Sequence, residues 1–334
     1  MVSAVIFVAT SCVSPLTGFA FWETNLAYEG ESIYNYLQVK NLSDRTILST
    51  NVLFGVQSVT MKDKGLTGMY YDTALAAPAL ADNANSALIL GMGTGTYARQ
   101  LKQYYPKMNI TGVEIDQKIT DLAGEYFDEP ADIPVTTYDG RAWLAASHDK
   151  YDVIMVDAYQ DITIPFQMSS TEFFTMVREH LNPGGVMVVN MNMISDGQGS
   201  INEVLSDTIA SVFGNGNTLT ADVPNTTNRE LFAKKPGSGS EENSMQQASK
   251  ALNLRETTYE RTGSEDLEWY MEEVASRFRK VNEPDSASTI LTDDKAPVEV
   301  LGMHAIDQII ADEAGPYRQI LKDEGFGGLL RAVQ

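Results

Sequence analysis

The sequence predicts an α/β fold: a doubly wound, mostly parallel sheet that follows a small antiparallel β domain and precedes a helical C-terminal tail. Three observations lead to this prediction. A buried strand runs into a glycine turn and a helix between Ala87 and Gln100. Apolar runs and helical patterns then alternate as far as residue 235, and short runs of alternating hydrophobicity come before them.

Composition narrows the range of partners. The chain has 334 residues, 43% of them hydrophobic, and its 24 basic and 45 acidic residues give a net charge of −21. Such a chain repels phosphates, so we predict no nucleic-acid partner and expect attraction for small cations such as polyamines. Cys12 is the only cysteine and excludes an intramolecular disulfide, which fits a reducing compartment. The three histidines lack metal-ligand spacing, so we expect no metal.

Residues 1–22 contain no charged side chain. A secretory signal peptide normally has an early Lys or Arg, and none is present. The run is about long enough to cross a bilayer, although Pro15 and Gly18 weaken it as a spanning helix. Three interpretations stay open: the end of a membrane region, a surface anchor, or a hydrophobic arm packed on the protein. The predicted location is cytoplasmic, with anchoring at the inner face of the membrane as one alternative.

The pattern of residues 23–68 predicts a β-hairpin domain. The runs YNYLQV, RTILST and VLFGVQSVT alternate in hydrophobicity and are separated by turn-rich breaks. The following stretch 68–80, GMYYDTALAAPAL, is typical of a helix that leads into the first core strand.

Residues 69–235 predict the central domain, in which strands and helices alternate. The expected strands are 87–90, 110–115, 135–138, 151–156 and 186–190, followed by a closing pair at 217–223 and 230–234. The expected helices start after Gly95 and cover 117–126, 141–146, 171–181 and 201–213. Residues 236–334 are expected to form a linker and a helical region, with a Gly/Ser-rich connector at 236–248, helices within 249–280 and a last helix at 305–324.

The glycine turn is the first candidate binding element. Gly91, Gly93 and Gly95 lie between a strand and a helix, where the backbone can approach a ligand and the helix start offers free N–H groups. About twenty residues later the second strand ends in Glu114 and Asp116, at the spacing expected of acids that bind ribose hydroxyls. A tight turn without a ligand is the alternative.

Two more strand ends provide acidic residues. Asp139 and Gly140 follow the third strand, where the carboxylate can accept a hydrogen bond from an adenine amino group or cap the next helix. Asp157 ends the most apolar strand, with Tyr159 and Asp161 nearby, and is a candidate base or cation anchor. A cap or a salt bridge is the alternative. Ligands of open parallel sheets lie beyond the carboxyl ends of the strands, so these groups are expected to converge.

These motifs resemble the spermidine synthases, or polyamine aminopropyltransferases. The likeness rests on the glycine turn, VEID, YDG, DAYQD, STEFF and NPGGVMVVN, and on SIYNYLQV and VLFGVQS before them, and it covers residues 30–235. The stretch LTDDKAPVE resembles the tail of the membrane-fused bacterial branch. The resemblance implies a Rossmann-like sheet of the class I methyltransferase type. It also implies aminopropyl transfer from decarboxylated S-adenosylmethionine to a small cationic amine, and a homodimer.

The resemblance also assigns residue roles. Glu114 would bind the ribose and Asp139 with Gly140 the adenine, and Asp157 would deprotonate the attacking amine beside Tyr70. The remaining assignments are Asn35 and Asp116 at the nucleoside and Gln57, Tyr71, Thr94, Tyr159, Gln160 and Asp161 at the substrates.

Two positions depart from the family pattern. Thr94 and Gln160 stand where the family usually has aspartates that bind ammonium groups. A neutral side chain can hydrogen-bond an amine but lacks the charge-assisted part of that interaction. Two alternatives therefore stay open: a methyl- or aminocarboxypropyltransferase that uses intact S-adenosylmethionine, and a non-catalytic domain that binds polyamines or nucleosides.

Overall fold

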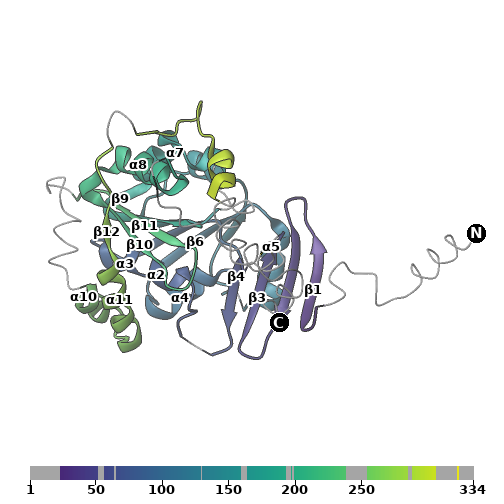
Figure 1. Cartoon of the computed structure of the whole chain (residues 1–334). Helices are drawn as coiled ribbons and strands as arrows, with labels where there is room; N and C mark the ends of the chain where they lie inside the picture. The colour runs from purple at the N-terminus through teal and green to yellow at the C-terminus, as the bar shows by residue number, and fades with distance from the viewer. Residues whose placement is uncertain are drawn as a thin grey trace, which may run out of the picture.

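The computed structural model describes residues 23–51, 56–63, 65–128, 130–158, 164–192, 197, 199–237, 254–284, 288–305 and 322. The predicted N-terminal arm, residues 1–22, lies outside them, as do Tyr159, Gln160 and Asp161. Figure 1 shows a small sheet at one end of a larger mixed sheet that is flanked by helices.

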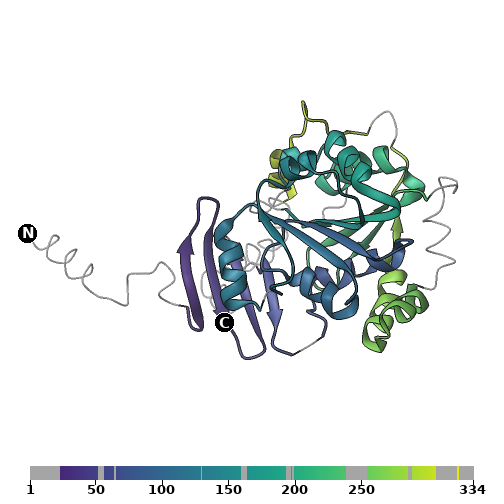
Figure 2. The same ribbon diagram turned by 180° about the vertical axis from the view of Figure 1, so that it is seen from behind.

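The small sheet is antiparallel, and its four strands are hydrogen-bonded in chain order. The strands are β1 (Leu26–Glu31), β2 (Tyr36–Asn41), β3 (Arg45–Thr50) and β4 (Ser58–Met61). The prediction of an N-terminal antiparallel sheet is confirmed, although the alternation had not singled out β1 because its residues are only partly buried. One face packs on helix α5 (Gln117–Tyr126), where Leu37, Val39 and Leu48 meet Ile119 and Leu122. Figure 2 shows this helix against the small sheet.

The large sheet has eight strands in the order β12-β10-β11-β9-β8-β5-β6-β7. Its strands are β5 (Ser86–Leu90), β6 (Asn109–Glu114), β7 (Val135–Thr137), β8 (Tyr151–Val156), β9 (Leu181–Met191), β10 (Thr218–Asp222), β11 (Arg229–Lys234) and β12 (Arg279–Lys280). Five neighbouring strands run parallel, in the sheet order β9-β8-β5-β6-β7. Strands β11, β10 and β12 continue the sheet in antiparallel fashion beyond β9. The predicted doubly wound sheet is confirmed.

Helices cover both faces of this sheet, so its strands are apolar on both sides. Along β5, Ala87 and Ile89 belong to one core cluster, and Leu88 and Leu90 belong to the other. One face is covered by α2 (Tyr70–Ala74), α3 (Ala76–Leu80), α4 (Thr96–Tyr104), α10 (Leu254–Thr262) and α11 (Glu265–Arg277). The other is covered by α6 (Gly140–Ala146), α7 (Thr171–His180) and α8 (Ile201–Phe213).

The C-terminal part departs from the prediction at one point. A helix was expected from residue 305, but it begins at Val298, directly after Pro297, and the described part of it ends at Ala305. Burial of Val298 and Ala305 in the second core cluster explains the earlier start, because packing outweighs the weak local pattern. The rest of the expected range is described only at Lys322.

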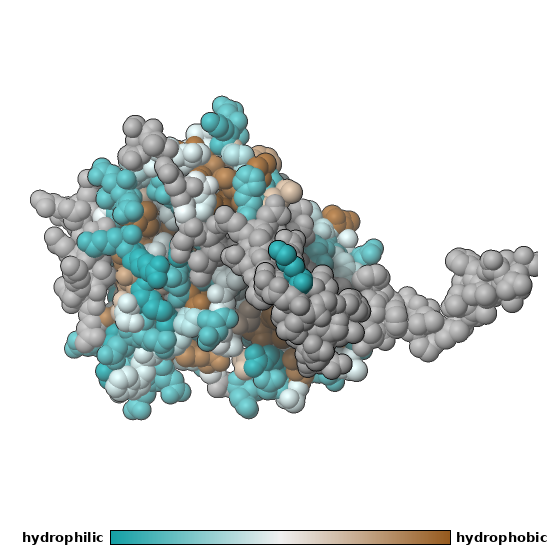
Figure 3. All heavy atoms as spheres, viewed as in Figure 1, coloured by the Kyte–Doolittle hydropathy of each residue, from teal (hydrophilic) through white to brown (hydrophobic). Residues whose placement is uncertain are grey.

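Among the described residues that are visible in Figure 3, hydrophobic ones lie scattered among hydrophilic ones. Within the described part of the chain, no helix has both the length and the apolar character needed to cross a bilayer. The predicted membrane association depends on residues 1–22 and therefore stays a prediction.

Candidate functional site

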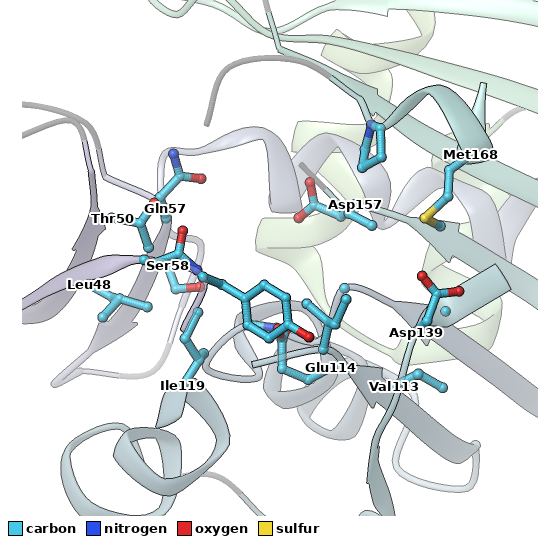
Figure 4. Close-up of a pocket in the computed structure, with 18 of the residues that line it drawn as sticks. Leu48, Thr50, Gln57, Ser58, Val113, Glu114, Ile119, Asp139, Asp157 and Met168 are labelled. Carbon is cyan, nitrogen blue, oxygen red and sulfur yellow. The ribbon is translucent and has the colours of Figure 1, made fainter. Parts of the chain in front are cut away.

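A cavity of about 330 Å³ lies beyond the carboxyl ends of β5, β6 and β8 and is closed on one side by the N-terminal sheet. In Figure 4, Leu48, Thr50, Gln57 and Ser58 lie on one side of it, and Asp157, Met168 and Asp139 lie on the other. This is the edge at which the chain order of the parallel strands reverses, between β5 and β8. Such switch points form the ligand crevice of open α/β sheets.

The glycine turn forms the floor of the cavity. Gly91, Gly93 and Gly95 all have positive φ, at 88°, 56° and 80°. A Cβ atom on Gly91 would lie 2.3 Å from the carbonyl oxygen of Asp157, so only glycine lets the two loops approach. Gly91 and Gly93 line the cavity, whereas Gly95 lies further back as the N-cap of α4.

Glu114 lies at the end of β6 and is held by backbone donors. Its two carboxylate oxygens accept hydrogen bonds from the backbone N–H of Gly93, at 2.8 Å, and of Asp116, at 3.0 Å. Burial raises the pKa of Glu114, and these backbone hydrogen bonds act in the opposite direction. The carboxylate is therefore oriented before any ligand arrives.

Asp116 does not line this cavity. Its carboxylate caps α5 by accepting from the backbone N–H of Lys118 at 3.0 Å, and it accepts from Ser32 Oγ at 2.6 Å and Asn35 Nδ2 at 3.1 Å. The residue is buried and joins the central domain to the β1–β2 turn. Asn35 therefore lines the cavity, and Asp116 holds Asn35 in position from behind it.

Asp139 and Gly140 both line the cavity. Asp139 is also the N-cap of α6, because its Oδ1 accepts a hydrogen bond from the backbone N–H of Ala142 at 2.8 Å. The two interpretations of Asp139 in the sequence are therefore compatible: capping fixes the carboxylate at the cavity edge.

Asp157 receives two side-chain hydrogen bonds. Tyr70 donates its hydroxyl to Oδ2 at 2.7 Å, and Asn190 donates Nδ2 to Oδ1 at 2.9 Å. Burial raises the pKa of Asp157 to about 7, although both hydrogen bonds lower it. Asn228 in turn donates to Asn190 Oδ1 at 2.9 Å. The sequence had not singled out Asn190, although it ends the apolar run of the NPGGVMVVN stretch.

The two tyrosines of α2 join Asp157 to the N-terminal sheet. The rings of Tyr70 and Tyr71 lie 4.0 Å apart between centroids, and Tyr71 donates its hydroxyl to the backbone carbonyl of Gln57 at 2.7 Å. Burial raises the pKa of Tyr70 well above its ordinary 10.0, so the phenol stays protonated and remains a donor to Asp157. Gln57 and both tyrosines line the cavity.

Thr94 is placed differently from its expected role. It is fully buried, it does not line the cavity, and its hydroxyl has no hydrogen-bond partner among the described residues. Its backbone N–H donates to Ser58 Oγ at 3.3 Å, so the residue packs behind the glycine turn. Direct substrate contact by the Thr94 side chain is not supported by this placement.

Three carboxylates dominate the charge of the cavity: Glu114, Asp139 and Asp157. No Lys, Arg or His lies among the described residues that line it. In the described part of the chain, no group of three or more His, Cys, Asp or Glu residues could hold a metal ion. This cavity therefore favours a cationic ligand.

The model of the spermine/spermidine synthase domain matches residues 69–235. The chain belongs to this family. Over all 334 residues it is 99% identical to a probable polyamine aminopropyl transferase of Bifidobacterium longum strain NCC 2705, and it spans 75% of that protein.

Two solved structures of the family share the fold. One is a probable spermidine synthase of Corynebacterium glutamicum ATCC 13032, with a TM-score of 0.54 and 21% identity over 80% of this chain and 99% of that one. The other is a spermidine synthase in complex with the transition-state analogue AdoDATO, with a TM-score of 0.54 and 18% identity over 75% of this chain and 89% of that one. At these identities the likeness concerns the fold, which agrees with the family match.

Proposed function

We propose that the chain transfers the aminopropyl group of decarboxylated S-adenosylmethionine to a primary amine of a polyamine-type acceptor, with Asp157 as the general base. The main support for this proposal is the environment of Asp157. This residue is a carboxylate of the cavity with a pKa of about 7, and two donors fix its orientation. A base with a pKa near the working pH is the one best suited to accept a proton.

The adenosine half of the donor would occupy the side of the cavity formed by the glycine turn, Glu114 and Asp139. The backbone-held carboxylate of Glu114 is suited to accept hydrogen bonds from ribose hydroxyls, and Asp139 from an amino group of the base. The absence of a side chain on Gly91 and Gly93 leaves room for a ligand next to the backbone.

The charge of the cavity supports the decarboxylated donor over the intact one. Intact S-adenosylmethionine has a carboxylate, and no basic side chain lies among the described lining residues to pair with it. The neighbouring stretch 159–163, YQDIT, contains no basic residue either. The decarboxylated donor and a polyamine are both cationic and complement Glu114, Asp139 and Asp157.

The reaction is a direct displacement. The lone pair of the acceptor nitrogen forms a bond to the aminopropyl carbon next to the sulfonium, and the carbon–sulfur bond breaks. Its electron pair goes to sulfur, which leaves neutral methylthioadenosine. One proton of the attacking amine passes to Asp157, whose carboxylate is kept in line by Tyr70 and Asn190. Alignment and removal of this proton are the contributions asked of the protein.

The experiment is a calorimetric titration with S-adenosylmethionine, its decarboxylated form and methylthioadenosine, combined with an assay for spermidine formed from putrescine. We expect tighter binding of the decarboxylated donor and of methylthioadenosine, together with turnover. Preference for the intact donor would favour a methyl- or aminocarboxypropyltransferase. Binding without turnover of any amine would favour a non-catalytic binding domain.

The identity of the acceptor amine, the homodimer and an attachment to the membrane through residues 1–22 stay predictions. Size-exclusion chromatography with light scattering tests the dimer. Flotation with vesicles, of the chain with and without residues 1–22, tests the attachment.

A further inference from the structure

The segment that follows the family-matched domain is built into the core near the cavity. Leu291 and Val298 are fully buried in the same core cluster as Met168 and Phe173. The backbone carbonyl of Leu291 accepts a hydrogen bond from the N–H of Thr171, at the start of α7, at 2.9 Å. The family match ends at residue 235, so the match itself leaves this segment unassigned.

Asp293 lies at the turn of this segment, and its carboxylate accepts three hydrogen bonds. Arg141 reaches its two carboxylate oxygens with Nη1 at 2.7 Å and Nη2 at 2.5 Å, and Ser170 donates Oγ to Oδ1 at 2.5 Å. Backbone hydrogen bonds between Thr292 and Lys295, at 2.9 and 3.1 Å, hold the turn. The hydrogen bond from Arg141, followed by that from Ser170, lowers the pKa of Asp293. The carboxylate is therefore charged and fixed in a two-pronged pair.

Arg141 links Asp293 to the wall of the cavity. It directly follows Gly140, which lines the cavity, and its Nη1 also donates to the backbone carbonyl of Gln167 at 2.7 Å. Gln167 and Met168 line the cavity from the short helix η2 (Phe166–Met168). The Met168 methyl group lies 3.6 Å from the position that a Cβ atom of Gly140 would take. One guanidinium thus fixes α6 relative to η2.

We propose that Asp293 is a positioning residue of the donor pocket, which acts by holding Arg141 so that Gly140 and the η2 wall stay at the spacing the adenine side requires. The ligand in this inference rests on the function proposed above. Without the carboxylate of Asp293, the guanidinium is free to turn toward Glu172 or Asp139, whose charges also act on it. The carbonyl of Gln167 would then lose its donor.

The chain offers a matched control. Asp294 is the neighbouring aspartate, and it makes none of the contacts that Asp293 makes to Arg141 and Ser170. We therefore compare Asp293→Asn with Asp294→Asn, which are the same chemical change one residue apart. The side chain of Asp293 is 40% exposed, so we expect its replacement to lower the stability of the fold only moderately and to leave the chain folded.

The ligand measurement is the Kd of methylthioadenosine, with kcat measured at saturating donor. We expect Asp293→Asn to raise the Kd about three- to tenfold with kcat nearly unchanged, and Asp294→Asn to change neither. Arg141→Gln should weaken binding similarly, and the double variant Arg141→Gln/Asp293→Asn should add little to either single change. If Asp293→Asn raises the Kd and also lowers both kcat and Tm, the role of Asp293 is purely structural and the proposal is overturned.

A second measurement needs no ligand. Hydrogen–deuterium exchange of residues 165–170 should become faster in Asp293→Asn than in Asp294→Asn, because the η2 wall has lost its support. Unchanged exchange would overturn the positioning role even if the nucleoside binds. If wild type binds no nucleoside, the proposed function fails, and the exchange measurement alone decides whether Asp293 holds the wall.

Discussion

Glu114 and Asp157 are two carboxylates of one cavity, the first buried and the second half-buried, and they differ in how they are held. The oxygens of Glu114 accept from backbone N–H groups, which belong to the glycine turn and to the residue before α5. The oxygens of Asp157 accept from two side chains, Tyr70 and Asn190. Backbone donors are part of the fold and are always present, whereas side-chain donors can tune a group and can be removed singly. The first arrangement suits a fixed binding group and the second suits a base.

The charge states follow the same division. Burial raises the pKa of both carboxyls, and the backbone hydrogen bonds of Glu114 oppose this rise. For Asp157 the rise leads to a pKa of about 7 despite its two donors. We therefore expect changes at Asp157 to act on turnover and its pH dependence, and changes at Glu114 to act on nucleoside affinity. Four predictions test this division.

The largest effect is expected for Asp157→Asn. Loss of the proton acceptor should lower kcat by about 10²–10⁴-fold, the range of general acid–base catalysis, with the Kd of methylthioadenosine nearly unchanged. The control is Asp149→Asn, an exposed aspartate just before β8. Turnover that persists in Asp157→Asn would remove this residue from the mechanism.

Glu114→Ala should give the opposite pattern. We expect nucleoside binding to weaken by about 1.5–3 kcal/mol, the value of a hydrogen bond to a charged group, while kcat at saturating donor changes much less. Calorimetry with methylthioadenosine measures the first quantity and a steady-state assay measures the second. Equal affinity in variant and wild type would contradict the assignment of Glu114 to the ribose.

Tyr70→Phe separates the tuning of Asp157 from its presence. The hydroxyl of Tyr70 lowers the pKa of Asp157, so its removal should raise that pKa. Because the deprotonated carboxylate is the base, kcat/KM of wild type should rise with pH through about 7, and this rise should move to higher pH in the variant. Tyr71→Phe is the control, because Tyr71 donates to Gln57 and not to Asp157. An identical pH profile in Tyr70→Phe and wild type would count against the hydrogen bond as a tuning element.

The smallest effect concerns stability. The pKa of Asp157 rises from 3.8 to about 7 on folding, so between these values the folded state binds more protons than the unfolded state. Its contribution to the free energy of unfolding is therefore lost as the pH rises from about 4 through 7. Asp157→Asn has no such group, and its Tm should exceed that of wild type by a few degrees at pH 8, with the difference shrinking toward pH 4. Thermal unfolding at several pH values measures this difference. A difference that is independent of pH would contradict the linkage.

Much of the fold could be predicted because its signals are local. The strand at residues 151–156 and the helices at 117–126 and 201–213 have the bounds expected from their apolar patterns and caps. The glycine turn was visible because positive φ angles select glycine. β1 was missed because only part of its surface is buried, and the start of the last helix was missed because packing of Val298 decided it.

Local sequence patterns were enough to show which residue types could perform the chemistry and to place them at strand ends. Which of these residues meet depends on packing in three dimensions. Tyr70 is 87 residues from Asp157, Asn190 is 33 residues from it, and Asp293 is 152 residues from Arg141. No local periodicity records such contacts, because they depend on strand order and on which face each element presents. The same packing turned Asp116 toward Ser32 and Asn35 and buried Thr94 behind the turn.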